Sequence, residues 1–205
     1  TIRNLYAVPT VAKWKLIVAD NASGPNTKAV LKALSKTYNF KIVAFSENKG
    51  HCHYFFELLK SKKYDIVVKL DNDILVPSYW LDIFIEDFEK IPNLAVVGAC
   101  WGGFLNYEKI QGSIFRFKAD TCHGCCLAAR TALVQDLPMI SDYLGLWRFH
   151  TAASKKYVAG CDLRVWIKDL SQTPLRVDYS KYYEKSKLMK HNKISIAEFV
   201  GEGDY

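Results

Sequence analysis

Apolar residues follow two different periods along the first hundred residues of the chain. Short continuous apolar runs, rich in β-branched residues, predict buried strands at residues 15–19, 40–45, 66–70 and 94–100. Apolar residues at helical spacing predict helices at residues 26–38, 53–62 and 79–90. Strands that alternate with helices pair in parallel through right-handed crossovers. The pattern therefore predicts an α/β fold, a doubly wound and mainly parallel sheet with helices on both faces.

The pattern changes after Gly103. Two more strands and a short helix are predicted at residues 114–118, 125–129 and 130–135. Residues 141–157 show no clear periodicity, and an irregular segment of this length inside a compact domain is usually functional or mobile. Residues 163–167 then predict a helix that begins next to Asp162, where an acid is favoured by the helix dipole.

The composition is that of an ordinary globular protein, with 205 residues, of which 50% are hydrophobic and 24% charged. This length suffices for one sizeable core, so a single domain over residues 1–205 is expected. No apolar run approaches the roughly 20 residues of a membrane-spanning helix, and the first residues lack the apolar core of a signal peptide. A cytoplasmic location is therefore expected, either in solution or on a membrane surface.

The 6 cysteines are few for this length and form no disulfide framework, so free thiols in a reducing compartment are expected. Cys122, His123, Cys125 and Cys126 lie close together and offer a zinc site as an alternative. Adjacent cysteines ligate one metal poorly, however, and no second ligand pair follows at finger-like spacing. Small cysteines packed in a buried strand explain the same residues.

The formal net charge is +7, and the excess of basic residues is concentrated near the C-terminus. The residues concerned are Arg176, Lys181, Lys185, Lys187, Lys190 and Lys193. Such a region favours anionic partners, either nucleotide phosphates or the lipid headgroups of a membrane surface. No nucleic-acid-binding motif is present, so nucleic acid is not an expected partner. A solvated basic face without a partner explains the same lysines.

Two carboxylates, Asp71 and Asp73, follow directly after the apolar run 66–68. Acids in such a place are costly unless a cation neutralises them, and hard oxygen ligands suit Mg²⁺ or Mn²⁺ held against a diphosphate. Asp and Asn also favour turns for local reasons, so the triplet alone decides nothing. Asp20 and Asn48 also follow predicted strands, however, and ligands of open α/β sheets bind beyond the carboxyl ends of the strands. The three turns are therefore expected to form one cleft.

In the order of these turns the chain resembles the nucleotide-sugar glycosyltransferases of family 2, which have the GT-A fold. The resemblance rests on Asp20-Asn21-Ala22-Ser23, Asn48-Lys49-Gly50, Leu70-Asp71-Asn72-Asp73 and Gly160-Cys161-Asp162. The family opens with a strand that this chain does not match, since Thr1 to Arg3 resemble the helix that follows it. The resemblance implies a nucleotide-sugar-binding half at residues 1–100 and an acceptor-binding half at residues 101–205 of one Rossmann-like domain.

The resemblance also implies a role for each matching residue. Nucleotide contacts are implied for Asp20, Asn21, Ser23, Asn48, Gly50, Asp71 and Asn72. Metal contacts are implied for Asp73, Asp71 and the late His191, with Asp73 as the direct ligand. Asp162 matches the general base of inverting members. The acceptor-side strand contains His123, and the aromatic and basic segment 146–150 offers Trp147 and His150 as acceptor contacts.

The expected function is therefore metal-dependent transfer of a sugar from a nucleoside-diphosphate sugar to an acceptor hydroxyl. The expected cofactor is Mn²⁺ or Mg²⁺, the favoured donor is a UDP-sugar, and inversion is the expected outcome. The acceptor would be a glycan, a glycoprotein or a glycolipid. Two alternatives stay open: a sugar nucleotidyltransferase, and a basic glycan-binding or nucleic-acid-binding module without catalysis, which leaves Asp71 and Asp73 unexplained.

Overall fold

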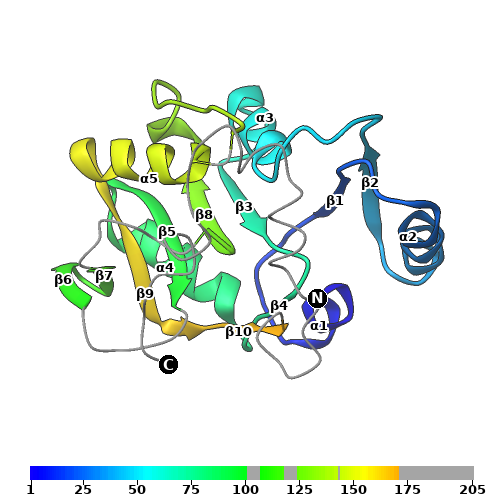
Figure 1. Ribbon diagram of the computed structural model, residues 1–205. Coiled ribbons are helices and arrows are strands. Elements are labelled where there is room, and N and C mark those ends of the chain that lie inside the picture. The colour runs from blue at the N-terminus through cyan, green and yellow to red at the C-terminus, as the bar shows by residue number, and fades with distance from the viewer. Residues whose placement is uncertain (101–106, 118–123, 143, 171–205) are drawn as a thin grey trace, which may run out of the picture.

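The computed structural model describes residues 1–100, 107–117, 124–142 and 144–170. Six strands form the main sheet in the order β3-β8-β5-β9-β7-β6 (Figure 1). Their bounds are Ile66–Leu70 for β3, Cys126–Arg130 for β8, Leu94–Cys100 for β5, Val158–Trp166 for β9, Ile114–Phe117 for β7 and Tyr107–Gln111 for β6. Within this sheet β5 pairs with β9 in parallel, and every other neighbouring pair is antiparallel.

A smaller unit lies to one side of the main sheet (Figure 1). It consists of β1 (Leu16–Asp20), which pairs in parallel with β2 (Phe40–Ala44), and of α2 (Pro25–Thr37). None of the residues of α2 is buried, although the helix is amphipathic. Among the described strands, β1 pairs only with β2 and β3 pairs only with β8. No described strand therefore joins β1 to β3.

Helices cover both faces of the main sheet. On one face α3 (His53–Ser61) and α5 (Gly145–Lys156) form a core with the sheet in which Phe56, Phe149 and Leu127 are at most 1% exposed. On the other face α4 (Trp80–Lys90) packs against the sheet, and Phe84 and Val97 are 0% exposed. Burial of these side chains from both directions is the main stabilising contribution to the fold.

Short elements support the loop that follows β3. They are α1 (Ile2–Ala7), β4 (Ile74–Leu75) and β10 (Lys168–Asp169). The 3₁₀ turn η1 (Thr131–Leu133) lies at the other end of β3, where the Thr131 amide donates to the Asp65 carbonyl at 2.8 Å. The side chain of Asn4 bonds to Val76 in both directions, at 2.8 and 3.2 Å, and β10 pairs with β4. The stretch after Leu70 is thus held from two sides.

The α/β class, the elements up to Cys100 and the helices on both faces are as the sequence predicted. Three expectations were wrong. The main sheet is mostly antiparallel, because β8 runs antiparallel to both β3 and β5, and β7 runs antiparallel to both β9 and β6. The segment 141–157 contains the helix α5, and residues 163–166 belong to the strand β9. This strand is central, with β5 and β7 on its two sides, and its first five residues are all buried, so the alternation that marks a strand is absent from residues 158–162.

Candidate functional site

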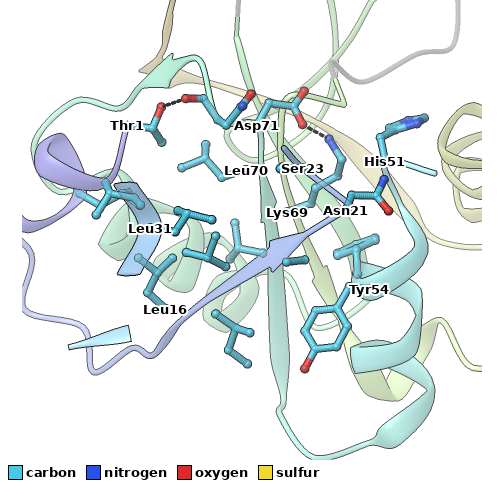
Figure 2. A pocket seen from close by; sticks show the side chains of 18 of the residues that line it. Thr1, Leu16, Asn21, Ser23, Leu31, His51, Tyr54, Lys69, Leu70 and Asp71 are labelled. Atoms are coloured by element: carbon cyan, nitrogen blue, oxygen red, sulfur yellow. Dashed lines mark hydrogen bonds and ion pairs between the residues drawn. The ribbon is translucent and has the colours of Figure 1, made fainter. Parts of the chain in front are cut away.

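A groove of about 860 Å³ lies between the small unit and the main sheet (Figure 2). Along most of its length the walls are apolar, with Leu16 and Leu31 from the small unit and Leu58 and Leu70 from α3 and β3. At the carboxyl ends of β1 and β3 the lining becomes polar. The polar lining residues there are Asn21, Ser23, Gly50, His51, Lys69, Asp71 and Asn72. The three turns predicted to form one cleft therefore do line one groove.

The turn after β3 is fixed by backbone hydrogen bonds. The amide of Asp71 donates to the Cys125 carbonyl at 2.8 Å, and the amide of Leu170 donates to the Asp73 carbonyl at 2.8 Å. The Thr1 hydroxyl lies 2.6 Å from the Asn72 carbonyl oxygen. Asp71 lines the groove, and Asp73 follows it in the same turn with a half-buried side chain. The two carboxylates thus sit on a loop that three separate segments hold in place.

Lys69 pairs with this turn through Asp71. Its side chain points along the groove floor toward Asp71 (Figure 2), and its ammonium group bonds the Asp71 carboxylate and, at 2.7 Å, the Gly124 carbonyl oxygen. The residue is only 7% exposed, whereas the Asp71 side chain is 39% exposed. The sequence analysis did not identify Lys69 as a site residue, although a lysine inside the apolar run of β3 is itself an unusual signal.

The turn after β1 is an Asp-centred turn. The Asp20 carboxylate accepts the Ser23 amide at 2.9 Å, and these hydrogen bonds with Ser23 lower the pKa of Asp20. Ala22 adopts φ +62°, a conformation that such a turn tolerates. Asp20 is 3% exposed and does not line the groove, whereas Asn21 and Ser23 do. The carboxylate of Asp20 thus shapes the turn that presents its neighbours.

Asn21 connects this turn to the one after β2. Its amide nitrogen donates to Asn48 Oδ1 at 2.7 Å, and its oxygen accepts the Lys49 amide at 2.8 Å. Gly50 follows with φ +90°, and a Cβ there would lie 2.7 Å from the Ser141 carbonyl oxygen. Only glycine fits both the conformation and the space. The turn of Asn48 to Gly50 therefore joins the groove to the segment that precedes α5.

The described residues include no cluster of three or more His, Cys, Asp or Glu side chains that could hold a metal ion. A preformed all-protein cage is therefore not the kind of site present in this part of the chain. Magnesium and manganese commonly bind through one or two carboxylates and complete their coordination with water and substrate phosphates. The turn of Asp71 and Asp73 beside an open groove fits that kind of site. His191, the third predicted ligand, lies outside the described residues.

Two of the three predicted acceptor residues, Trp147 and His150, lie on α5. His123 lies outside the described residues, and Trp147 is 48% exposed on the surface of α5. His150 is 2% exposed, because Leu146, Phe149, His150 and Ala153 form the buried face of that helix. The expectation of an irregular segment was wrong, because it contains the helix α5. Acceptor contacts by Trp147 and His150 stay a prediction, and His150 is buried in this structure.

Asp162 lies in β9 and is 0% exposed. The Arg164 guanidinium bonds both of its carboxylate oxygens, at 2.7 to 3.2 Å, and also bonds Asp87 at 2.7 Å and Glu86 at 2.9 Å. Burial acts to raise the pKa of Asp162, but the hydrogen bonds from Arg164 and Asp87 outweigh it and hold the pKa below its usual value. Asp162 does not line the groove, and Gly160 beside it admits the backbone of β7, since a Cβ there would lie 2.2 Å from Phe115 O.

Asp87 is the second buried acid of this network, 1% exposed on α4. Burial, together with the neighbouring Asp162, raises the pKa of Asp87 to about 7, although Ser113 and Arg164 bond the same carboxyl group. The sequence did not predict this network, because Asp162 and Arg164 were expected at the start of a helix. In a strand, residues i and i+2 share a face, which brings the two side chains together.

A second acid, Asp142, lies closer to the groove than Asp162 does. Its carboxylate pairs with Arg148 at 2.6 Å, and its negative charge interacts electrostatically with His51, which lines the groove. Desolvation and the Lys69 ammonium lower the pKa of His51, while Asp71 and Asp142 act to raise it. Ser141, the residue before Asp142, is held against the turn of Asn48 to Gly50, since its hydroxyl donates to the Lys49 carbonyl at 2.7 Å.

These features can be compared with known proteins. A family model described as Glycosyl transferase family 2 matches residues 1–135. The chain belongs to glycosyl transferase family 2. A poly-beta-1,6-N-acetyl-D-glucosamine synthase of Staphylococcus epidermidis is 29% identical to this family 2 chain over 113 residues, 54% of this chain and 27% of the relative. The poly-beta-1,6-N-acetyl-D-glucosamine synthase of Staphylococcus aureus strain COL is 27% identical over 133 residues, 64% of this chain and 31% of the relative. The chain thus spans less than a third of these relatives.

Solved structures show the same GT-A fold. TarS of S. aureus has a TM-score of 0.58 at 14% identity, over 89% of this chain and 35% of TarS. The mannosyltransferase PcManGT of Pyrobaculum calidifontis, solved with GDP-Man and Mn²⁺, has a TM-score of 0.60 at 16% identity, over 95% of this chain and 59% of its own. The family and the fold class predicted from the sequence are thereby confirmed.

The 5 cysteines within the described residues are free thiols, as expected. Burial raises the pKa of Cys52 to about 12, so this thiol is not a nucleophile at neutral pH. No helix within the described ranges combines the length and the hydropathy that crossing a bilayer requires.

Proposed function

We propose that this chain transfers a sugar from a nucleoside-diphosphate sugar to an acceptor hydroxyl and requires a divalent cation. The observation that carries the proposal is the polar end of the groove, where Asn21, Asp71 and Asn72 meet beyond the carboxyl ends of β1 and β3. Ligands of open α/β sheets bind at this position. Family membership supports the same reaction class, and so do the neighbours solved with UDP or with GDP-Man and Mn²⁺.

The donor would lie along the polar end of the groove. Asn21 and Ser23 are proposed to contact the base and ribose, with Asp20 acting through the turn that it stabilises. Asp71 and Asn72 would lie beside the ribose and the diphosphate. Asp73 is the proposed direct ligand of Mn²⁺ or Mg²⁺, and such an ion would neutralise the charge that develops on the departing diphosphate. A UDP-sugar is the favoured donor, in keeping with the UDP complexes of TarS and GalNAc-T7.

The acceptor is proposed to be a growing glycan, because the two relatives described above are named as poly-beta-1,6-N-acetyl-D-glucosamine synthases. Inversion requires a base on the face of the sugar opposite the leaving group. Asp162 is the candidate base that the resemblance implies. Asp142 is a second candidate, which is favoured by its electrostatic contact with His51 at the groove and by its partly exposed side chain.

A thermal-shift panel tests the proposal. The chain would be heated with UDP, GDP, CDP or dTDP at 1 mM, each with Mn²⁺, Mg²⁺ or EDTA, and with UMP as the control that lacks the second phosphate. A ligand at about 100 times its Kd stabilises a protein by about 2.7 kcal/mol, which is roughly 5 to 10 °C in Tm for a chain of this size. UDP with Mn²⁺ is expected to give the largest shift. A panel without any shift from a nucleoside diphosphate in either metal would overturn the proposal.

A further inference from the structure

We propose that Lys69 is a positioning residue of the donor site that keeps the Asp71 carboxylate out of the metal's coordination shell and supplies a fixed cation for the diphosphate. This inference rests on the proposed function, and it goes further because it assigns a role to Lys69, which the proposed function does not use. Asp73 would hold the ion, whereas Asp71 is already neutralised by the protein itself.

The first support is burial. Lys69 is 7% exposed in the middle of an apolar strand, and a buried ammonium is costly unless it is paired and hydrogen-bonded. Here the ammonium bonds Asp71 and, at 2.7 Å, the Gly124 carbonyl oxygen. An exposed lysine would contribute little to such a pair. A buried one holds the carboxylate in a fixed position.

The second support is geometry. Lys69 and Asp71 stand two residues apart, so their side chains leave the strand on the same side, and Figure 2 shows them meeting on the groove floor. Asp73 stands beyond the end of the strand, in the same turn as Asp71. An ammonium group carries three protons, and the two contacts above use two of them. Because Lys69 lines the groove, we infer that the third proton is offered to a phosphate oxygen.

Removal of the Lys69 charge should therefore change the affinity for Mn²⁺ and the affinity for metal-free UDP in opposite directions. Without the ammonium group, Asp71 becomes free to bind a divalent ion, and the turn gains one negative charge. Mn²⁺ alone should then bind more tightly, because a competing cation is gone. UDP in the absence of metal should bind more weakly, because repulsion from the carboxylates is no longer offset. A residue with only a structural role would weaken both kinds of binding.

The experiment uses Lys69→Met and Lys69→Gln, of which the second keeps an amide donor for the Gly124 carbonyl in case the first fails to fold. Lys41→Met, which removes an exposed lysine from β2, is the matched control. Electron paramagnetic resonance measures the binding of Mn²⁺ alone, and calorimetry measures the binding of UDP in EDTA. Both variants should bind Mn²⁺ about threefold to tenfold more tightly and metal-free UDP about tenfold more weakly, whereas Lys41→Met stays at wild-type values.

A further Asp71→Asn change in Lys69→Met should abolish the gain in Mn²⁺ affinity, since Asp71 would be the ligand that Lys69 had withheld. Changes of the same sign in both affinities, or no change in either, would overturn the role of Lys69. Failure of the wild-type chain to bind UDP with Mn²⁺ would instead overturn the proposed function, and the Mn²⁺ measurement would still test Lys69 by itself.

Discussion

Removal of the Arg164 guanidinium is the most severe single change that the structure predicts outside the hydrophobic core. Arg164 bonds two acids that are almost completely buried, Asp162 and Asp87. Replacement by methionine keeps the apolar part of the side chain and removes every one of these hydrogen bonds. It leaves two adjacent carboxyl groups, 0% and 1% exposed, without a counter-charge.

The expected cost follows from that burial. Breaking a buried ion pair by removing one partner typically costs about 3 to 5 kcal/mol, because the remaining charge stays desolvated. For a chain of this size each kcal/mol lowers Tm by roughly 2 to 4 °C, so Arg164→Met should lower Tm by about 10 °C at pH 7.5. The loss should be smaller at pH 5.5, because Asp87, with a pKa raised to about 7, is already protonated there.

Urea unfolding at the two pH values, followed by circular dichroism, measures the cost directly. Lys90→Met is the control, since Lys90 pairs with Glu86 on the exposed side of α4 and such pairs contribute about 0.3 to 0.5 kcal/mol. An additional Asp87→Asn change should recover part of the stability of Arg164→Met, because it removes one of the two orphaned charges. A free energy of unfolding for Arg164→Met within 1 kcal/mol of the wild type would refute the reasoning.

Three further predictions concern single residues. Asp87 has a pKa raised from 3.8 to about 7 in the folded chain, so its contribution to stability is complete below pH 4 and is lost as the pH rises through 7. Asp87→Asn should therefore gain in Tm relative to the wild type between pH 5 and pH 8, and a constant difference would contradict this. Asp162→Asn and Asp142→Asn, each assayed with an active donor and acceptor, should show which acid is the general base. Replacement of the base should lower turnover about 100-fold or more and leave UDP binding unchanged. Near-normal turnover in either variant would exclude that residue as the base. Gly50→Ala forces a Cβ against the Ser141 carbonyl at φ +90°, so both Tm and UDP affinity should fall, and an unchanged affinity would separate this turn from the site.

The first half of the fold could be predicted because its signals are local. The strand β3 and the helix α4 each show an undisturbed period, and turn residues follow at once. Parallel strands place their carboxyl ends at one edge, so the meeting of Asn21, Gly50 and Asp71 along one groove followed from the order of the elements.

The second half depends on contacts between distant segments. The buried face of α5 contains His150, a residue type that does not mark an apolar stripe, and Trp147 on the same helix is exposed. The first five residues of the strand β9 are all buried, and the apolar residues that follow, Leu163, Val165 and Trp166, are compatible with a helix as well as with a strand. The pairs of Lys69 with Asp71 and of Arg164 with Asp162 need side chains two residues apart to share a face. That holds only once the residues are known to lie in or beside a strand.

The central claim is that a divalent ion at Asp73 links the chain to a nucleoside diphosphate. Calorimetry of UDP binding with and without Mn²⁺ tests it most directly, with Asp73→Ala compared with Asp65→Ala, an exposed acid that precedes β3. The account predicts that Mn²⁺ strengthens UDP binding in the wild type and in Asp65→Ala, and that Asp73→Ala loses this Mn²⁺-dependent gain while its Tm stays within about 3 °C of the wild type. An Asp73→Ala protein that binds UDP with the same Mn²⁺ dependence as the wild type would contradict the account.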